Sequence, residues 1–286
     1  MSSVEDWAKP NPVTENRSGL IGKAVDRYEG PLKVTGTAPY AYEVEAPSPP
    51  AYGVMVSAAI AKGRIASMDT AAAEASPGVL LVWTHRNAPA QGARPARYDF
   101  FTPSPRPALE SDRVHFFGQQ IAIVIADTLE NAQAAAALVS VSYEADTHAV
   151  DFPAHYDEAV QPPGESDVEI GDFDAGFAAA PVTLDDVWRT PLQNHCQMEP
   201  CATTAWWEGD RLTLHTSVQM VRFAQGSLAE TLMVPAKNVR LLTRYIGGGF
   251  GGKGSLYEDM VLAALAAREL GRPVKVAFSR QQMMDG

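Results

Sequence analysis

Apolar and polar positions divide the chain into two regions of regular structure. In the first region, apolar residues alternate with others from Ala51 to Met68, and a second apolar run covers Val79 to Thr84. A period of two is typical of strands with one buried face. Thr70 to Ala75 predicts a short helix that stops before Pro77. We therefore expect mixed α and β structure from about residue 51.

The clearest local unit closes this first region. Gln120 to Ala126 (QIAIVIA) is a continuous apolar run, which predicts a fully buried strand. Thr128 can cap a helix over Leu129 to Leu138, and Val139 to Tyr143 predicts another strand. The order strand, helix, strand predicts a β-α-β unit that ends a first domain near residue 150.

A second region follows an acidic connection that contains proline and glycine. Alternating strands are expected at Val182 to Arg189, Ala202 to Trp207, Arg211 to Ser217 and Val239 to Ile246. A helix is expected over Ser227 to Met233. A longer helix is expected from about Leu256 to Leu270, because its apolar residues share one face and Gly271 and Pro273 follow it.

These patterns predict four parts along the chain and a fold of the α+β or α/β class. The parts are an N-terminal arm (1–25), a first domain (26–150), a connection (151–180) and the start of a second domain (181–286). Composition changes this picture little. A chain of 286 residues with 46% hydrophobic and 20% charged residues is typical of a globular protein with a large core.

The net charge of −11 argues against nucleic acid as a partner, because phosphate backbones are bound by clustered Lys and Arg. No stretch approaches the roughly 18 apolar residues of a membrane span, and the first residues contain no apolar signal segment. We therefore expect no membrane insertion and, from this sequence by itself, a cytoplasmic location. Cys196 and Cys201 are too few and too close together to predict a disulfide framework.

The candidate chemistry lies in Gly247 to Gly252 (GGGFGG), between a predicted strand and a predicted helix. Glycines lack a Cβ atom, so backbone N–H groups can approach a ligand closely. The N-terminus of the following helix would add partial positive charge. This arrangement suits an anion or an oxo group.

Other interpretations of this loop remain open from the residues alone. Gly247, Gly249 and Gly252 satisfy the dinucleotide-binding pattern G-x-G-x-x-G, although no Asp or Glu ends the next predicted strand. A phosphate-binding Walker loop fits worse, because Gly254 follows Lys253 where Ser or Thr is required. A tight turn that packs a helix on a sheet is the plainest alternative.

Several segments, in this order, resemble the xanthine dehydrogenase/aldehyde oxidase family, and the bacterial periplasmic aldehyde oxidoreductase type in particular. They are Asp26 to Val44, Ser76 to Val82, Val114 to Glu144, Gly171 to Ala180, Gln197 to Gln219 and Val234 to Lys253, the last ending in IGGGFGGK. The resemblance implies an α/β-hammerhead domain followed by a truncated first part of a molybdopterin-binding domain, all from the N-terminal part of the large subunit.

The resemblance also implies a chemistry. Family members hydroxylate aldehydes or heteroaromatic carbons with oxygen from water, using the molybdenum cofactor (molybdopterin, in some members the cytosine dinucleotide form). Electrons leave through 2Fe-2S and FAD subunits. Expected partners are these two subunits, the C-terminal molybdopterin-binding chain or remainder of the subunit, and a small aldehyde. A partner that carries an export signal would allow a periplasmic location.

By the family's pattern, Gln219 would hydrogen-bond to an oxo ligand of the metal. Phe250 and the Gly251 amide would line the same side, and Gly248 and Gly249 would belong to the same cofactor-binding loop. The protein supplies no side-chain ligand to the metal. Gly254 is a candidate for the substrate pocket, because purine oxidisers of the family carry Glu there. Gly at this position favours an aldehyde over a purine.

Two departures from the family matter. Cys201 replaces the His of the family's M-E-P-H-A pattern. Family members also run more than twice as far, and their general-base Glu lies in the C-terminal half. No catalytic residue is therefore expected in this chain, and the chain by itself is expected to be inactive. It would be an enzyme only as part of a complex. A non-catalytic assembly or scaffold fragment is the alternative from a different class.

Four residues between positions 195 and 201 have alternative interpretations. His195, Cys196 and Cys201 are close in sequence, but three ligands without a fourth in zinc-site spacing do not predict a metal site. Glu199 is either a site carboxylate or, more simply, a carboxylate that orders a neighbouring loop.

Overall fold

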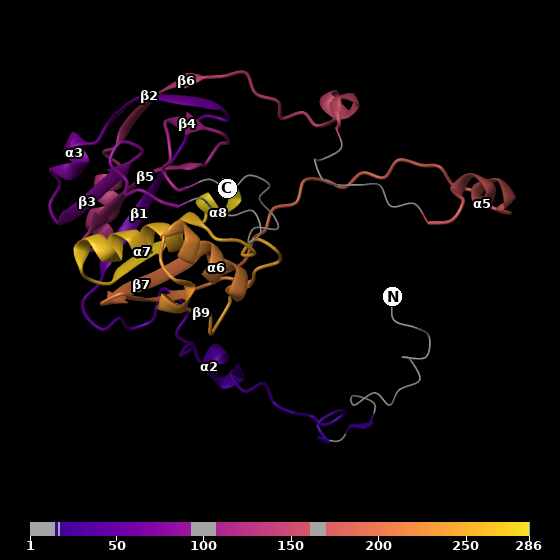
Figure 1. The fold of residues 1–286 in the computed structure, drawn as a ribbon, viewed down its shortest axis with the longest axis horizontal. Coiled ribbons are helices and arrows are strands. Elements are labelled where there is room, and N and C mark those ends of the chain that lie inside the picture. Colours follow the sequence, from indigo (N-terminus) through magenta and orange to yellow (C-terminus); the bar gives the residue numbers. More distant parts are fainter. Residues whose placement is uncertain (1–14, 17, 93–106, 161–169, 286) are drawn as a thin grey trace.

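A computed structural model describes residues 15–16, 18–92, 107–160 and 170–285 of the chain. The predicted N-terminal arm and the predicted connection 151–180 lie partly outside these residues. Figure 1 shows a body of sheets and helices, from which the chain before α2 (Gly30–Val34) and the chain around α5 (Phe173–Ala179) extend.

A seven-stranded mixed sheet forms the centre of the body. In spatial order its strands are β3 (Val79–Thr84), β5 (Gln120–Ala126), β1 (Ala51–Ser57), β10 (Val274–Ala277), β7 (Ala202–Glu208), β8 (Arg211–Thr216) and β9 (Val239–Leu242). Strand β1 pairs in parallel with β10, with Ala51 opposite Val274. The first and second regions of the sequence therefore meet within one hydrogen-bonded sheet.

Strand β5 shows why a continuous apolar run forms a central strand. All seven of its residues are buried, and it pairs with β3 on one side and β1 on the other. Ile123 and Ile125 join the main core, whereas Val124 joins a smaller cluster with Ala135 of α4 (Leu129–Ala136). Successive side chains point to opposite faces of a sheet. Both faces of β5 are covered, so no polar position is needed.

A second sheet of three strands corrects the prediction of a simple β-α-β unit. Its order is β4 (Arg113–Val114), β2 (Gly63–Asp69) and β6 (Ser140–Ala145). The expected order of strand, helix and strand is present, and the Thr128 side chain caps α4 by accepting from the Asn131 N–H (3.1 Å). However, β5 and β6 belong to different sheets. Strand β6 has no buried residue, so it cannot occupy a central position like that of β5.

A second correction concerns the segment from Ala51 to Met68, which was predicted as one strand. It forms two strands, β1 and β2, which belong to different sheets. Gly63, the first residue of β2, has a φ of 148°. A one-dimensional pattern cannot show where a strand changes its partner.

Helix α7 (Glu258–Leu270) covers the second half of the large sheet, and Figure 1 shows it in front of β7. Nine consecutive residues, Asp259 to Ala267, are buried. The indole Nε1 of Trp207 donates to the Ala264 carbonyl (2.8 Å), which fixes the helix on β7. Gly271 ends the helix in the left-handed region (φ 60°), as the sequence predicts.

Shorter elements complete the fold. They are α3 (Ala71–Glu74), the 3-10 helix η3 (Pro153–Glu158), α6 (Val221–Thr231), the 3-10 helix η4 (Ala236–Asn238) and α8 (Gln282–Asp285). Helix α6 begins at Val221 rather than at the expected Ser227. None of the helices in the described part of the chain is long and apolar enough to cross a membrane.

A strap of residues 38–45 crosses the face of the large sheet opposite α7. The Thr204 hydroxyl donates to the Ala41 carbonyl (2.8 Å), and the Lys275 ammonium donates to the Tyr42 carbonyl (2.6 Å). Thr203, the neighbour of Thr204, faces the helix side and bonds to Asp259. The N-terminal region therefore packs on strands from the far end of the chain.

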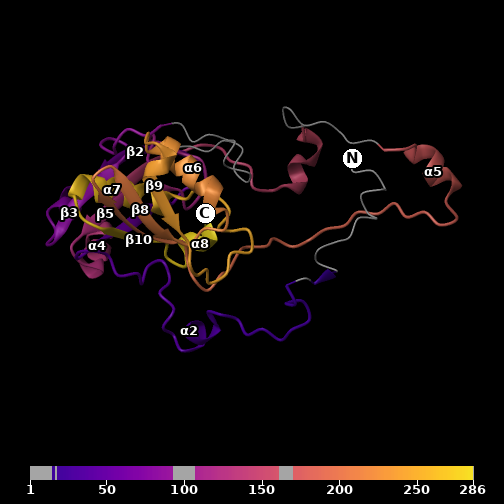
Figure 2. The same ribbon diagram turned by 60° about the horizontal axis from the view of Figure 1, so that its bottom comes forward.

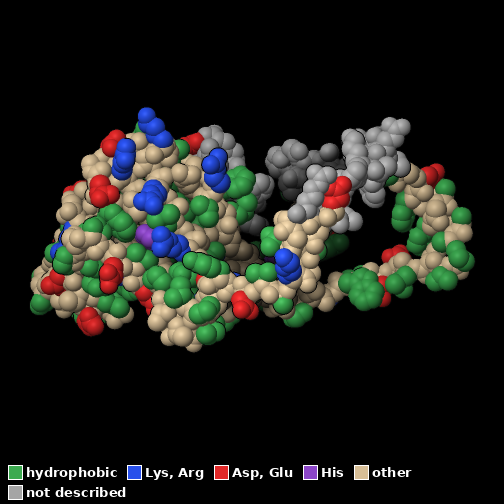
Figure 3. Space-filling model, turned by 90° about the horizontal axis from the view of Figure 1, so that it is seen from below, with side chains coloured by type: hydrophobic (Ala, Val, Ile, Leu, Met, Phe, Trp, Pro, Cys, Tyr) green, Lys and Arg blue, Asp and Glu red, His purple; other side chains and the backbone are tan. Residues whose placement is uncertain are grey.

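The strand expected over Val182 to Arg189 is wrong. Residues 181–200 contain no strand, and Val182, Leu184 and Trp188 are exposed. A segment with alternating apolar residues forms a strand only where it can pair with a neighbouring strand and bury one face. Neither condition is met in this segment. Figure 2 shows this chain leaving the body as an extended segment, and Figure 3 shows hydrophobic side chains along it.

Candidate functional site

The glycine loop (residues 247–252) follows β9 after an intervening stretch, residues 243–246, and needs an unusual backbone. Gly248 and Gly251 have φ values of 97° and 99°, which residues with a Cβ rarely adopt. Phe250 lies between them with a φ of 54°, also in the left-handed region, and its side chain is 73% exposed. A bulky residue in this conformation indicates a constrained loop.

The other three glycines allow close packing on side chains of the protein itself. A Cβ on Gly247 would lie 2.5 Å from Glu199 Cβ, and one on Gly249 would lie 2.5 Å from Gln219 Cδ. A Cβ on Gly252 would lie 2.9 Å from His195 Cγ. The sequence predicted glycines that admit a ligand. In the structure, the space left by the missing Cβ atoms of these three glycines is occupied by Glu199, Gln219 and His195.

The side chain of Gln219 lies against the loop in a defined orientation. Its Oε1 atom accepts from the N–H groups of Gly251 and Lys253 (both 3.2 Å), and its own backbone N–H donates to the Lys253 carbonyl (2.7 Å). Only an oxygen can accept from two N–H groups, so this fixes which amide atom faces the loop. Within the described residues the Nε2 group has no protein acceptor, and it is left as a hydrogen-bond donor.

Glu199 and Lys253 form a buried ion pair beneath the loop. The Lys253 ammonium donates to Glu199 Oε2 (2.9 Å), and the Lys253 and Glu199 side chains are 0% and 12% exposed. The same carboxylate oxygen accepts from the Gly247 N–H (2.8 Å), while the Glu199 N–H donates to the Gly247 carbonyl (3.1 Å). Of the two interpretations of Glu199, this geometry favours a carboxylate that orders the loop.

The helix after the loop begins later than expected. Helix α7 starts at Glu258, several residues beyond the loop, and its first turn carries Glu258 and Asp259. A carboxylate such as that of Glu258 stabilises the positive end of the helix dipole. The idea that the helix N-terminus would lend charge to the glycine loop is therefore wrong, and the loop depends on its own N–H groups.

Asp259 brings a second buried carboxyl close to the site. Its Oδ2 atom accepts from the Thr203 hydroxyl (2.7 Å), which also lies 2.7 Å from the Thr216 hydroxyl, while its buried Oδ1 atom has no partner in the described structure. Burial raises the pKa of Asp259 to about 7. The carboxyl therefore titrates near neutral pH.

The remaining candidates are placed as follows. Gly254 is buried, and Cys201 is buried in the main core. Burial, with Asp259 nearby, raises the pKa of the Cys201 thiol. Cys196 is exposed. Among the residues that the structure describes, no group of three or more His, Cys, Asp or Glu could hold a metal ion.

Two buried polar residues of the site were missed by sequence reasoning. Lys253 was considered only within a phosphate-binding pattern and a family-like segment, and no role was expected for Gln197. Gln197 is fully buried, neither of its amide atoms has a partner in the described structure, and its Cβ lies 3.0 Å from a Cβ placed on Gly248. The available signals for the ion pair were a lone Lys directly after a glycine run and a Glu beside a proline, but these two residues lie 54 positions apart.

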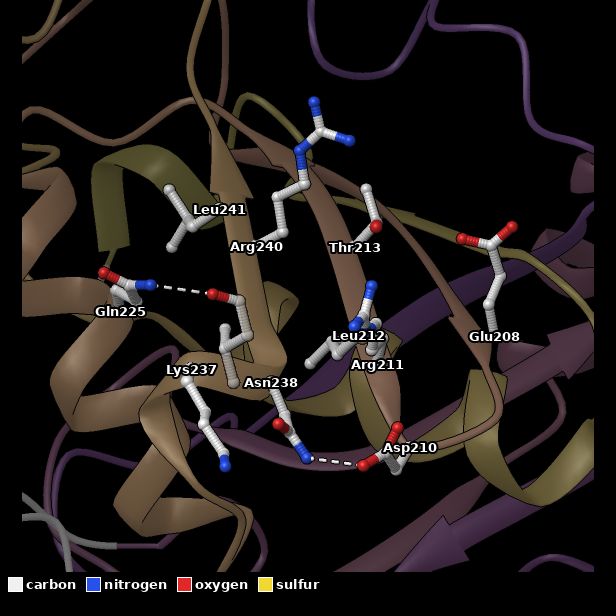
Figure 4. A pocket seen from close by; sticks show the side chains of 11 residues that line it. Glu208, Asp210, Arg211, Leu212, Thr213, Gln225, Lys237, Asn238, Arg240 and Leu241 are labelled. Carbon is white, nitrogen blue, oxygen red and sulfur yellow. Dashed lines mark hydrogen bonds between the residues drawn. The ribbon is translucent and has the colours of Figure 1, made fainter.

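A large surface hollow lies away from this loop. It has a volume of about 790 Å³, lies over β8 and β9, and includes no residue of the glycine loop. Figure 4 shows Asn238 donating to Asp210 Oδ2 and Gln225 donating to a backbone carbonyl. These bonds fix the β7–β8 turn to η4 and α6 to β9. The hollow is open and bordered by both signs of charge, and it does not contain the candidate chemistry.

The strand order disagrees with the dinucleotide-binding interpretation. The helix after the glycine loop leads from β9 to β10, but β7 and β8 lie between these two strands, and β7 runs antiparallel to both of its neighbours. A dinucleotide-binding β-α-β unit lies in a mostly parallel sheet. That interpretation is therefore wrong.

Two family models match this chain. The model of the aldehyde oxidase and xanthine dehydrogenase a/b hammerhead domain matches residues 35–147. The model of the molybdopterin cofactor-binding domain matches residues 155–285, which include the glycine loop.

Curated relatives match almost the whole chain. It is 46% identical over 276 residues to the aldehyde oxidoreductase molybdenum-binding subunit PaoC of Escherichia coli, covering 96% of this chain and 36% of that protein. It is 29% identical over 269 residues to the xanthine dehydrogenase molybdenum-binding subunit of another strain of Escherichia coli, covering 90% and 36%. The chain thus spans about a third of the length of these relatives.

Solved structures give the same result for the fold. The aldehyde oxidoreductase from Desulfovibrio gigas matches with a TM-score of 0.73 and 27% identity, covering 90% of this chain and 30% of that one. The CO dehydrogenase from Oligotropha carboxidovorans matches with a TM-score of 0.74 and 27% identity, covering 91% and 35%. This chain therefore belongs to the xanthine dehydrogenase/aldehyde oxidase family, as an α/β hammerhead domain followed by a molybdopterin cofactor-binding domain.

Proposed function

We propose that this chain forms one wall of the molybdenum cofactor site in a hydroxylase that oxidises aldehydes or, as a second class, heteroaromatic carbons. The observation that carries the proposal is the orientation of Gln219. Because two loop N–H groups hold its Oε1 atom, its Nε2 donor is directed away from the loop. A preset donor suits an oxo group, which can only accept hydrogen bonds.

The loop backbone fits the same acceptor-rich group. In the described structure, the N–H groups of Gly248 and Phe250 donate to no protein acceptor, whereas the Gly251 N–H is already used by Gln219. We propose that Gln219, Gly248, Gly249, Phe250 and Gly251 together hold the cofactor. The bound cofactor would supply the hydroxylation chemistry, with oxygen from water.

The role of this chain in the reaction is binding and orientation. Gln219 and the free N–H groups would orient the cofactor, and the exposed Phe250 side chain would exclude water from one side of it. Gly254, buried beyond Lys253, would leave the substrate pocket without a carboxylate at that position. This supports an aldehyde over a purine as the substrate.

Other polypeptide would complete the site. The chain spans about a third of its curated relatives, so we propose that the general-base Glu and most pterin contacts come from polypeptide beyond these residues. Partner subunits with a 2Fe-2S cluster and FAD would accept the electrons, and the pterin would be the cytosine dinucleotide form. The complex would be cytoplasmic, or periplasmic if a partner carries an export signal.

Metal analysis tests the proposal. The chain would be purified from its native host with the polypeptides that accompany it. Molybdenum would be measured by mass spectrometry and the pterin by fluorescence after oxidation. We expect near-stoichiometric molybdenum and faster oxidation of an aromatic aldehyde than of hypoxanthine. A well-folded preparation with neither molybdenum nor pterin would contradict the proposal and favour the assembly or scaffold alternative.

A further inference from the structure

We propose that Glu199 and Lys253 are positioning residues that set the direction of the Gln219 amide. The consequence for the cofactor rests on the proposed function, whereas the consequence for the loop does not. Neither residue is exposed enough to meet a ligand directly, because the Glu199 and Lys253 side chains are 12% and 0% exposed. Any effect on the site must therefore pass through the residues that they hold.

Lys253 connects the buried pair to Gln219. Its ammonium bonds to Glu199 Oε2 (2.9 Å), its backbone N–H donates to Gln219 Oε1 (3.2 Å), and its carbonyl accepts from the Gln219 backbone N–H (2.7 Å). One residue thus joins the carboxylate beneath the loop to both the side chain and the backbone of Gln219. A shift of Lys253 would move the N–H that holds the Gln219 side-chain amide and the carbonyl that holds the Gln219 backbone.

Glu199 fixes the other end of the loop. Its Oε2 atom accepts from the Gly247 N–H (2.8 Å) at the first loop residue and from Lys253 directly after the last one. A single carboxylate oxygen therefore ties together the two ends of the six-residue loop. Hydrogen bonds to charged groups are stronger than neutral ones, and burial shields them from water.

The direction of the Gln219 amide depends on these ties. While the loop ends are held, two N–H groups face Oε1, and Nε2 points outward. If the loop relaxes, the amide can turn and present oxygen instead. An outward oxygen would repel an acceptor such as an oxo group, whereas an outward N–H binds it. The pair would thus control donor or acceptor character at the site.

The experiment separates position from stability with a charge-neutral double variant. Glu199→Gln or Lys253→Met alone leaves one buried charge unpaired, which destabilises a protein strongly. The double variant Glu199→Gln/Lys253→Met leaves no charge, and apolar or neutral replacements of similar size are often tolerated. The matched control is Arg64→Met/Glu144→Gln, which removes an exposed ion pair far from the loop.

Three quantities would be measured on each variant in the complex: Tm, amide hydrogen exchange of peptides covering residues 246–254, and kcat and KM for an aldehyde. We expect each single variant to lower Tm by about 5 °C or more, and the double variant to recover most of that loss. Amide hydrogen exchange of the loop in the double variant should nevertheless stay about 10- to 100-fold faster than in wild type. This is the change expected when hydrogen bonds to a charged group are lost. Its kcat should fall on the order of tenfold or more, with KM little changed.

The outcomes decide between the alternatives. If the double variant regains both wild-type loop exchange and wild-type kcat along with Tm, the pair is only structural and the positioning role is overturned. If wild-type protein lacks molybdenum but its variants show the expected loop exchange, the proposed function fails while the control of the loop stands. The control pair should change neither loop exchange nor kcat.

Discussion

Two ion pairs in this molecule have nearly the same length and very different surroundings. Arg64 of β2 and Glu144 of β6 pair across the small sheet (Nε–Oε2 2.7 Å), with side chains 51% and 59% exposed. Lys253 and Glu199 pair beneath the glycine loop (2.9 Å), with side chains 0% and 12% exposed. The first pair competes with water, and the second does not. Burial, rather than distance, decides which pair controls its surroundings.

The largest expected difference comes from removing the cation of each pair. Lys253→Met leaves Glu199 buried without its counter-ion, so the free energy of unfolding should fall by about 3–5 kcal/mol. Arg64→Met should give no measurable loss, because an exposed pair is screened by solvent. Urea denaturation of both variants measures the difference. Equal losses would show that the pair at the glycine loop is not isolated from water.

Asp259 sharpens the comparison through pH. Its folded pKa, raised to about 7 by burial, exceeds its ordinary value of 3.8. The folded state therefore favours the protonated form, and the associated stability is fully present below about pH 4 and is lost as pH rises through about 7. The loss amounts to about 4 kcal/mol.

Asp259→Asn should remove this slope, because the amide cannot titrate. Its stability relative to wild type should rise between about pH 4 and pH 7 and level off at higher pH, measured as the free energy of unfolding at several pH values. A constant difference across that range would mean that folding does not raise the pKa of Asp259.

Glycine substitutions test the close packing over the buried pair. Gly247→Ala places a Cβ 2.5 Å from Glu199 Cβ and 3.3 Å from its backbone nitrogen, where little can move. We expect a loss of about 1–3 kcal/mol, typical of overpacking. Gly249→Ala meets only the flexible end of Gln219, so its loss of stability should be smaller. Thermal unfolding of both variants ranks them, and the reverse order would contradict the structure.

The smallest expected effect concerns Gln197. Its buried amide has no partner in the described structure, and neither has Glu199 Oε1. Internal water commonly satisfies such groups. If it does so here, Gln197→Met should lower the free energy of unfolding by about 1 kcal/mol, and a high-resolution crystal structure should show the water. A more stable variant would indicate that the amide is truly unpaired.

Much of the local structure was predictable because it depends on neighbours in sequence. The β5 run, the Thr128 cap of α4 and the Gly271 end of α7 all appear as expected. The strand expected from Val182 is absent because strand formation depends on distant residues. A strand must pair with a neighbouring strand, and the local sequence pattern does not show whether one is present. The β-α-β prediction failed likewise, because the sheet that receives each strand is a non-local choice.

The candidate site divides in the same way. The glycine loop and Gln219 were named from the sequence through a family resemblance, since their order along the chain carries that information. The orientation of the Gln219 amide, the ties from Glu199 to both loop ends and the burial of Lys253 were not predictable. These contacts join residues that lie 34 to 54 positions apart.

The sequence by itself thus determined the family, most strands and helices, and the loop that carries the candidate chemistry. These follow from local propensity, period and motif order, which act between residues close along the chain. The tertiary structure alone decided that both regions share one sheet, that a buried ion pair supports the loop, and that an amide donor rather than an acceptor faces outward. Such properties depend on which distant groups meet and on how completely water is excluded where they meet.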